Sequence, residues 1–335
     1  MRSIVKNAKY IEIVTSPIGE LHLMPQKILL NLYETLSRHY AKVKISIIND
    51  LKELNELAIN NPDLVFSGIK YLGFDEYTIK RDSIKKIWFS KFLDKHNILY
   101  TGSPKEAIEL EFDKSKAKRT VQNHGIKTAS FFVAKPNQFK KDEIPLSFPL
   151  FVKPLFEGDS RGIDSNSLVH NYKEYQKKVK AIFEDQNTVS LVEKYLSGKE
   201  YTIAIIQDFK NDSYQIYPIE LLAQKNNKGD RILGFSDKIA DREQVFEIED
   251  KNIKNMVSKL AIDSFKALGA KGYGRIDIKM DERGVPYFLE ANLIPGLGYG
   301  YFYRCYNLNT RSTHEQMILG IVGNAFGKIR ERENI

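Results

Sequence analysis

Apolar residues recur with two different periods along the first hundred residues. Apolar runs rich in β-branched residues predict short β-strands at residues 9–15, 43–50, 63–68 and 97–103. Apolar residues spaced three or four positions apart predict a helix with Ile28, Leu29, Leu32 and Leu36 on one face, and another helix around residues 82–95. Strands that alternate with helices favour a mostly parallel sheet covered by helices.

The pattern changes after residue 103. Residues 111–126 predict a helix, and residues 189–208 predict two apolar strands joined by a short SGK turn. A further helix is expected at 251–268, where a glycine follows its last turn. We therefore expect a parallel α/β part followed by α+β hairpins, with domains at residues 1–103, 104–188 and 189–335.

The segment GYGRIDIKMDERGVPYFLEANLIPG (272–296) predicts a β-hairpin with an apolar and a polar side. A four-residue turn at Asp281–Gly284 pairs Met280 with Val285, and it places Asp277 opposite Phe288. Because side chains alternate between the two faces of a strand, this register gathers one polar set on one side. The set comprises Arg275, Asp277, Glu290 and Asn292.

Two carboxylates and an amide oxygen, without histidine or cysteine, form a hard oxygen donor set. Such a set suits magnesium or manganese better than zinc, and magnesium commonly takes further oxygens from water and from substrate phosphates. The polar side of the hairpin therefore predicts a metal site with Asp277, Glu290 and Asn292 as ligands. The alternative is a structural ion pair between Arg275 and one of the two carboxylates.

The segment FPLFVKPLFEGDSRGID (148–164) is a candidate phosphate-binding loop. A strand delivers Lys153, and the following loop contains Glu157, Gly158 and Ser160, whose backbone amides and hydroxyl can surround phosphate oxygens. The chain has neither a P-loop nor a Rossmann glycine motif. On its own, such a loop is weak evidence for phosphate binding, because most loops of this kind are ordinary surface loops.

Further polar residues extend the candidate site. Glu193 and Glu200 flank the hinge sequence KYL, which can offer backbone groups to an adenine edge and a carboxylate to ribose hydroxyls. Lys114 and Lys238 are candidate cations for phosphate. The alternative for all four is exposure to solvent, which is usual for lysine and glutamate.

Composition narrows the class of protein. The chain has 335 residues, 42% of them hydrophobic and 28% charged, as expected for a globular protein with two or three packed parts. The formal net charge of +8 suits an acidic ligand such as phosphate, although lysine-rich surfaces give the same value. Basic residues are spread along the chain, which argues against nucleic-acid binding.

Cysteine content and hydropathy indicate where the protein works. Cys305 is the only cysteine, so the chain cannot form an internal disulfide, and the six histidines include no cluster with zinc-site spacing. No apolar run approaches the ~18 residues that span a bilayer, and the N-terminal residues lack a signal-peptide core. We expect a cytoplasmic protein without a membrane partner.

The motifs, taken in order, resemble the ATP-grasp superfamily, and within it the D-alanine:D-alanine ligases. The resemblance is carried by FDKSKAKR, FPLFVKPLFEGDSRGI, LVEKYLSGKEYTIAII, GFSDK and the hairpin sequence given above. It covers residues 100–296 and extends more loosely over the N-terminal part. It implies ATP held between two α+β halves and two magnesium or manganese ions at the phosphates.

The resemblance also implies individual roles. Lys114 and Lys153 would bind the nucleotide, Glu193, Lys194, Tyr195 and Leu196 would contact adenine, and Glu200 would bind ribose. Lys238 would reach the terminal phosphate, Ser160 would lie in a mobile loop over the phosphates, and Arg275 would stabilise a phosphorylated intermediate. The implied activity is ADP-forming ligation of a carboxylate to an amine through an acylphosphate, and the implied assembly is a homodimer.

The chain departs from the D-alanine:D-alanine ligases in the segments that would bind substrate. The glycine-rich HG-x-x-GEDG motif is missing from residues 66–82, and LGYGYFYRC (297–305) replaces the hydroxyl residues expected after the Pro-Gly turn. Glu20, in SPIGE, is a candidate contact for the amine of the first substrate. These departures predict small-molecule substrates other than two D-alanines.

Three alternatives remain open from the sequence. The first is authentic D-alanine:D-alanine ligation. The second is a non-catalytic ATP-binding module, although such a module has no need of Arg275 together with three metal ligands. The third is ligation onto the end of a peptide or protein, for which the basic surface could dock an acidic tail.

Overall fold

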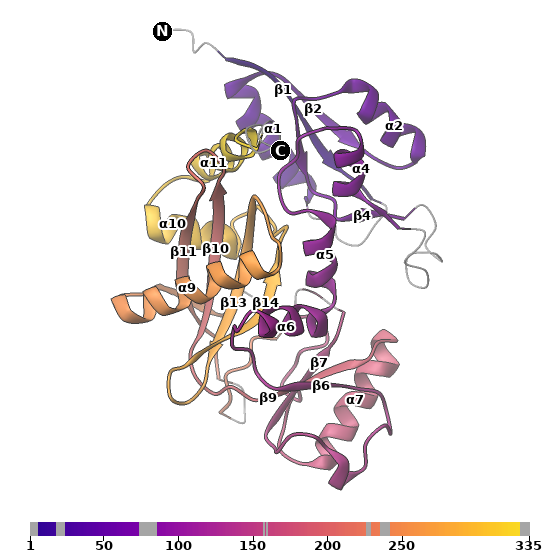
Figure 1. Cartoon of the computed structure of the whole chain (residues 1–335), viewed down its shortest axis with the longest axis vertical. Coiled ribbons are helices and arrows are strands. Elements are labelled where there is room, and N and C mark those ends of the chain that lie inside the picture. The colour runs from indigo at the N-terminus through magenta and orange to yellow at the C-terminus, as the bar shows by residue number, and fades with distance from the viewer. Residues whose placement is uncertain are drawn as a thin grey trace.

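The computed structural model describes residues 6–17, 24–73, 86–156, 158, 160–225, 229–234 and 242–328. Its sheets lie one after another along an elongated molecule, with the N-terminal sheet at one end and helix α7 (Tyr172–Gln186) at the other (Figure 1). The five-stranded sheet of the C-terminal half lies between them (Figure 1).

The N-terminal sheet is parallel, as the sequence predicts. Strand β1 (Asn7–Thr15) lies between β2 (Tyr40–Ile47) and β3 (Leu64–Ser67), and it pairs with both in parallel. Helix α1 (Gln26–His39) buries Leu29, Leu32 and Leu36, which belong to the predicted apolar face. The predicted strand at 97–103 contributes a single parallel bridge, from Tyr100 to Val65.

Several short N-terminal elements differ from the prediction. Helix α2 (Leu51–Asn60) was not predicted; Asp50 caps it by accepting a hydrogen bond from the amide of Glu53. The helix expected around 82–95 is shorter, because α4 (Phe89–Lys95) follows a small hairpin formed by β4 (Tyr71–Leu72) and β5 (Ile87–Trp88). Residues 82–85 lie outside the described residues.

The helix predicted at 111–126 is wrong in its extent. Two helices, α5 (Lys105–Phe112) and α6 (Lys114–Asn123), meet at Asp113. Asp113 has an extended backbone conformation, and its carboxylate accepts hydrogen bonds from the amides of Ser115 and Lys116. An N-cap of this kind begins a new helix, so the chain turns at Asp113.

A four-stranded antiparallel sheet follows, in the order β6-β9-β7-β8. Its strands are β6 (Phe131–Ala134), β7 (Leu150–Pro154), β8 (Leu168–Val169) and β9 (Ser190–Lys194). A short 3-10 turn, η2 (Lys141–Glu143), lies between β6 and β7. Helix α7 packs Tyr175, Val179 and Ile182 against the sheet.

The five-stranded sheet is antiparallel and has the order β12-β11-β10-β13-β14. Its strands are β10 (Glu200–Asp208), β11 (Ser213–Leu222), β12 (Gln244–Glu247), β13 (Tyr273–Met280) and β14 (Pro286–Asn292). Helix α9 (Lys251–Ala267), close to its predicted bounds, packs on one face against Tyr201, Ile203 and Ile205. Helices α10 (Tyr301–Thr310) and α11 (His314–Phe326) pack on the other face.

The predicted hairpin at 189–208 is wrong. Both apolar runs are strands, but β9 pairs with β6 and β7, whereas β10 pairs with β11 and β13. Residues 195–199 therefore pass from one sheet to the other. Gly198 lies in this hinge and donates a backbone hydrogen bond to the carbonyl of Met280, at 2.9 Å.

The predicted register of the β13–β14 hairpin is also wrong in detail. The structure pairs Asp277 with Glu290 and Ile278 with Phe288, so Leu289 is an extra residue in β14. Met280 pairs with Pro286 instead of Val285, so the turn is one residue longer than predicted, and this shift places Phe288, 1% exposed, in the core beside α9. The bulge at Leu289 then returns Glu290 to the side of Asp277. Arg275 lies opposite Asn292, and the polar set still shares one face.

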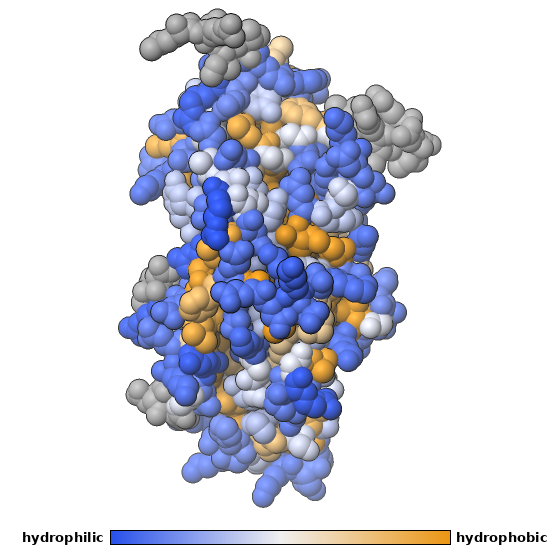
Figure 2. All heavy atoms as spheres, turned by 90° about the vertical axis from the view of Figure 1, so that its left-hand side faces the viewer, coloured by the Kyte–Doolittle hydropathy of each residue, from blue (hydrophilic) through white to orange (hydrophobic). Residues whose placement is uncertain are grey.

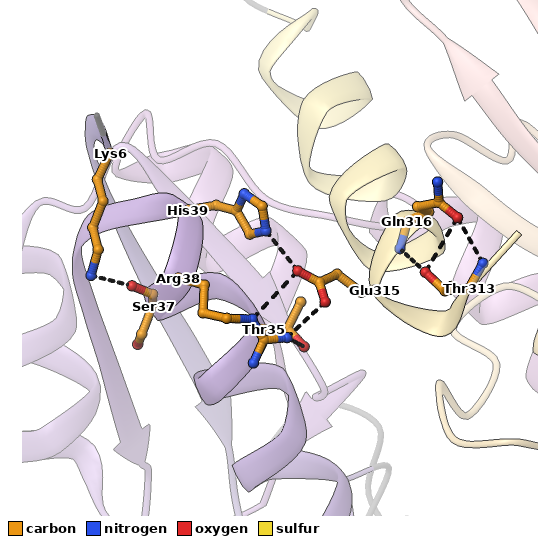
Figure 3. A network of polar contacts seen from close by, with 8 residues as sticks. All are labelled: Lys6, Thr35, Ser37, Arg38, His39, Thr313, Glu315 and Gln316. Carbon is orange, nitrogen blue, oxygen red and sulfur yellow. Dashed lines mark hydrogen bonds and ion pairs between the residues drawn. The ribbon is translucent and has the colours of Figure 1, made fainter. Parts of the chain in front are cut away.

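Helix α1 contacts the C-terminal helix α11 through a polar network (Figure 3). Glu315 of α11 accepts hydrogen bonds from His39, at 2.7 Å, and from Arg38, at 2.8 Å. Close packing continues at Gly298, where a Cβ atom would lie 2.9 Å from Cδ1 of Ile28. These contacts join the N-terminal part to the segment that follows the β13–β14 hairpin.

The surface carries no extended apolar area on the face drawn in Figure 2. Hydrophilic residues cover most of that face and separate small apolar areas (Figure 2). Over the described ranges, we find no helix whose length and apolar character would suffice to cross a membrane.

Candidate nucleotide and metal site

A cavity lies between the two antiparallel sheets and is lined by residues of both. Its walls come from β7 and β9 of one sheet and from β10, β13 and β14 of the other. Most of the described residues that were predicted from the sequence to form the site line this cavity: Lys153, Ser160, Glu193, Lys194, Tyr195, Leu196, Glu200, Arg275, Asp277 and Glu290.

Some selected residues lie elsewhere. Lys114 is half-buried at the start of α6 and does not line the cavity, and neither does Gly158. Asn292 lies opposite Arg275 at the end of β14, next to the cavity wall. Glu20, Glu157 and Lys238 are outside the described residues.

Lys153, which lines one wall of the cavity, belongs to a network of buried charged residues. Nζ of Lys153 lies 2.8 Å from Oε2 of Glu193 and 3.8 Å from Oε2 of Glu290. Lys118, from α6, forms a second ion pair with Glu193 and donates a 2.6 Å hydrogen bond to the hydroxyl of Thr128. Burial opposes ionisation of Glu193, but the two ammonium groups outweigh it and hold the pKa of Glu193 below its usual value.

Lys118 was missed in the sequence, although a signal was present. It lies three residues from both Ser115 and Val121, so it shares the buried face of α6 with them. A lysine on the buried face of an otherwise amphipathic helix is unusual, because lysine is almost never fully buried unless it is paired. That position marks Lys118 more clearly than the half-buried Lys114.

The opposite wall carries the polar side of the β13–β14 hairpin. Arg275 binds Asp277 through two hydrogen bonds of 3.0 Å, and Thr202 donates to the same carboxylate at 2.5 Å. Burial disfavours the charged form of Arg275, but Asp277 outweighs it and raises the pKa of the guanidinium. The ion pair considered from the sequence therefore exists, and any metal bound by Asp277 would share its carboxylate with Arg275.

Asn292 provides a test of whether these residues suit a metal ion. Its Oδ1 atom is buried and has no hydrogen-bond partner in the described part of the chain. A buried amide oxygen without a partner is costly unless a ligand satisfies it. No group of three or more His, Cys, Asp or Glu residues in the described ranges could hold a metal alone. Two carboxylates and this amide oxygen fit an ion that takes its remaining ligands from phosphate and water.

The hinge end of the cavity is mostly apolar, with Leu196, Leu221 and Ile232 among its walls. Glu200, the predicted ribose ligand, forms an ion pair of 2.9 Å with Lys279. The sequence prediction missed Lys279, which lies two residues after Asp277 and so shares its side of β13. Burial disfavours the charged form of Lys279, but Glu200 outweighs it and raises the lysine pKa.

The far end of the cavity is formed by Tyr301, within the segment that departs from the family pattern. Its ring centroid lies 5.3 Å from Cζ of Arg275, and its hydroxyl donates a 2.6 Å hydrogen bond to Oε1 of Glu243. Burial and this hydrogen bond raise the pKa of Tyr301, so the hydroxyl stays protonated. Glu243 was not selected from the sequence, where it lies in a charged stretch without a motif.

Glu243 differs from the other buried acids in the described ranges. Its Oε2 atom is buried and has no hydrogen-bond partner there. Both carboxylate oxygens are engaged by hydrogen bonds or ion pairs in the others, which are Glu12, Glu193, Asp277 and Asp281. The other oxygen of Glu243, Oε1, accepts hydrogen bonds from Tyr301 and, at 3.5 Å, from Arg304. Glu243 is therefore a paired buried acid with one unsatisfied oxygen beside the cavity.

The two antiparallel sheets enclose a cavity, with Lys153 on one side and the acids of the β13–β14 hairpin on the other. This arrangement is that of an ATP-grasp fold. The chain belongs to the D-alanine–D-alanine ligase family, because the family model described as D-ala D-ala ligase C-terminus matches residues 120–318. Both the fold class and the family expected from the sequence are confirmed.

The similar proteins are D-alanine–D-alanine ligases. The Lacticaseibacillus casei (strain BL23) protein is 28% identical over 204 residues, which are 61% of this chain and 54% of that protein. This chain therefore matches about half the length of that relative. The protein of Pelotomaculum thermopropionicum is 27% identical over 272 residues, 78% of each chain.

Solved structures with the same fold cover nearly the whole chain. The Bacillus anthracis D-alanine–D-alanine ligase complexed with ATP has a TM-score of 0.70 at 20% identity, covering 97% of this chain and 100% of that one. The VanG D-Ala:D-Ser ligase from Enterococcus faecalis has a TM-score of 0.66 at 18% identity, covering 95% and 100%.

Proposed function

We propose that the protein is an ATP-dependent, ADP-forming ligase that joins a carboxylate to an amine. The observation that carries this proposal is the cavity, which combines a buried lysine wall with an acidic hairpin wall in a member of the D-alanine–D-alanine ligase family. A bound polyphosphate needs positive charge around it. Lysine supplies that charge on one side, and a divalent ion held by the carboxylates would supply it on the other.

The walls suggest how ATP would lie. The apolar hinge end, with Leu196, would receive adenine, and Glu200 would bind the ribose hydroxyls after releasing Lys279. Lys153 would bind phosphate, with Ser160 and the neighbouring backbone closing over it. Lys114 and Lys238 remain predicted phosphate ligands.

Asp277, Glu290 and Asn292 would hold magnesium or manganese. When bound, such ions neutralise phosphate charge and orient the terminal phosphate for attack. Arg275, which already binds Asp277, would place its remaining donors near the reacting groups. Its positive charge would stabilise the negative charge that develops on the transferred phosphate.

The proposed reaction has two steps. The substrate carboxylate attacks the γ-phosphate of ATP, which forms an acylphosphate and releases ADP. The amine then attacks the acyl carbon and displaces phosphate, giving an amide. Water would hydrolyse the acylphosphate, so the segment at 158–162 must exclude it while the amine arrives.

We place the amine substrate at the end of the cavity formed by Tyr301 and Glu243. The hydroxyl of Tyr301 donates its proton to Glu243, so toward any other polar group its oxygen can act only as an acceptor, which favours an N–H donor. The buried charge of Glu243 likewise favours a cationic ammonium group nearby. The same negative charge disfavours the carboxylate that D-alanine would bring, and we therefore propose an amine other than D-alanine as the second substrate.

Authentic D-alanine–D-alanine ligation is the second candidate, supported by the similarity to proteins named D-alanine–D-alanine ligases. A phosphate-release assay separates the two candidate functions. It contains ATP, magnesium and pairs of substrates drawn from D- and L-amino acids, small carboxylates and amines, and mass spectrometry identifies the products. We expect release that needs both a carboxylate and an amine. A product formed best from two D-alanines supports the second candidate. Tight ATP binding without release from any pair would instead indicate a non-catalytic module.

A further inference from the structure

Lys118 is fully buried, yet it does not line the cavity. It lies behind Glu193, and its ammonium group contacts the Glu193 carboxylate and the hydroxyl of Thr128. Thr128 in turn donates a 2.7 Å hydrogen bond to the carbonyl of Phe288 in β14. Lys118 therefore does not line the cavity, and Glu193 is the cavity residue that it contacts.

Around Glu193, this network contains more positive than negative charges. Two ammonium groups, those of Lys118 and Lys153, share the single carboxylate of Glu193. Lys153 lies at the cavity surface and has a second, longer contact of 3.8 Å with Glu290. Lys118 has only Glu193 as an ion-pair partner within the described ranges.

We propose that Lys118 is a positioning residue that keeps Glu193 paired, so that Lys153 is free to turn from Glu193 to a phosphate of ATP. This inference rests on the proposed function. A carboxylate as buried as Glu193 cannot be left without a cation, because an unpaired buried charge is strongly destabilising. With Lys118 in place, Lys153 can leave Glu193 at small cost. Without Lys118, phosphate and Glu193 compete for the same ammonium group.

The competition gives a prediction about binding. In Lys118→Met, the affinity for ATP should fall about tenfold or more, although the changed side chain never touches the nucleotide. If the Glu193 charge is also removed, in Lys118→Met/Glu193→Gln, Lys153 has no buried competitor. That double variant should bind ATP at least several-fold more tightly than Lys118→Met.

The test is calorimetric binding of a non-hydrolysable ATP analogue with magnesium to the full chain. The wild type, both variants above and Glu193→Gln are compared. Lys116→Met is the matched control, because Lys116 is an exposed lysine on the same helix, with its side chain 71% exposed. The control should bind like the wild type. Thermal melting of each variant without nucleotide shows whether it is folded.

The outcomes separate this inference from the proposed function. If the wild type binds no ATP analogue, the proposed function fails. If the wild type binds but Lys118→Met binds equally well, Lys118 has no such role. If the double variant binds as weakly as Lys118→Met, the effect of Lys118 is structural and the inference is overturned. Should Lys118→Met fail to fold, the inference expects the double variant and Glu193→Gln to bind alike, because neither keeps the Glu193 charge that Lys118 would hold. Markedly weaker binding by the double variant overturns the inference.

Discussion

Asp277 of β13 lies directly opposite Glu290 of β14, and both carboxylates line the cavity. Directly opposed residues in an antiparallel pair have Cβ atoms about 5 Å apart, so two negative charges repel each other there. Arg275 offsets part of this repulsion from one side and Lys153 from the other. The opposed pair is thus prepared for a further cation, which a divalent ion would supply.

Replacing either acid tests this site. Asp277→Asn and Glu290→Gln should each lower phosphate release by about 10²- to 10³-fold, because charge stabilisation at the transferred phosphate is lost. The melting temperature should change little for Glu290→Gln, since the substitution relieves repulsion. Glu282→Gln, at the exposed turn of the same hairpin, is the control and should keep full activity. Full activity in both variants would show that the metal ligands lie elsewhere.

The hinge between the two sheets makes a separate prediction. A Cβ atom on Gly198 would lie 2.3 Å from the carbonyl oxygen of Asp281 and 2.7 Å from that of Met280, and neither backbone atom can move easily. Gly198→Ala should therefore destabilise the fold by about 1–3 kcal/mol in urea unfolding. Gly320→Ala is the control in α11, because nothing lies within 4 Å of its added methyl group. It should be neutral or stabilising by up to about 1 kcal/mol, and equal losses in both would contradict the clash.

Local pattern predicted most elements of the fold, and the errors share one physical cause. The apolar runs of β9 and β10 were recognised as strands, but their partners lie far away in the chain, so a local hairpin was the wrong pairing. The register of β14 failed for the same reason. Packing against α9, which the hairpin sequence alone does not show, places Phe288 in the core through a turn one residue longer than predicted. The bulge at Leu289 then returns Glu290 to the polar side.

The candidate site was predicted where residue type and spacing form a motif. Lys153 and Glu193 belong to such motifs and meet in the cavity, as do Asp277 and Glu290. Lys118 and Glu243 were missed because neither belongs to a motif, and the chain is rich in lysine and glutamate. For Lys118 the helical period offered a signal, whereas for Glu243 the sequence offered none.

The contact between α1 and α11 should depend on pH. Hydrogen bonds from His39 and Arg38 lower the pKa of Glu315 below its usual value of 4.5 (Figure 3). A depressed carboxyl pKa contributes stability that is present above the usual value and is lost as pH falls through the folded pKa. Glu315→Gln should therefore be less stable than the wild type at pH 7, by at most about 1 kcal/mol for so exposed a pair. Urea unfolding should show this difference disappear below about pH 4, and a constant difference would contradict the assignment.

Neutralising Glu243, unlike Glu315, is expected to raise the stability of the fold. Glu243→Gln removes a buried charge whose Oε2 atom has no hydrogen-bond partner in the described ranges, while an amide oxygen can still accept the hydrogen bonds that Tyr301 and Arg304 donate. Stability should rise by about 1 kcal/mol. Glu12→Gln is the comparison, because both oxygens of that buried acid are engaged, and it should lower stability by about 1–3 kcal/mol. A loss in Glu243→Gln as large as in Glu12→Gln would mean that Glu243 serves the fold.

Tyr301, which donates a hydrogen bond to Glu243, lines the end of the cavity where we place the amine substrate. Tyr301→Phe keeps the ring beside Arg275 but removes the only oxygen that the side chain presents to the cavity. With the best carboxylate and amine pair from the phosphate-release assay, KM for the amine should rise about tenfold, while KM for ATP stays within about twofold. Tyr303→Phe is the matched control on α10, since Tyr303 packs against Tyr299 and His314 and does not line the cavity. An equal rise in both KM values would place Tyr301 in the general structure of the site, whereas a rise confined to the amine would assign it to amine recognition.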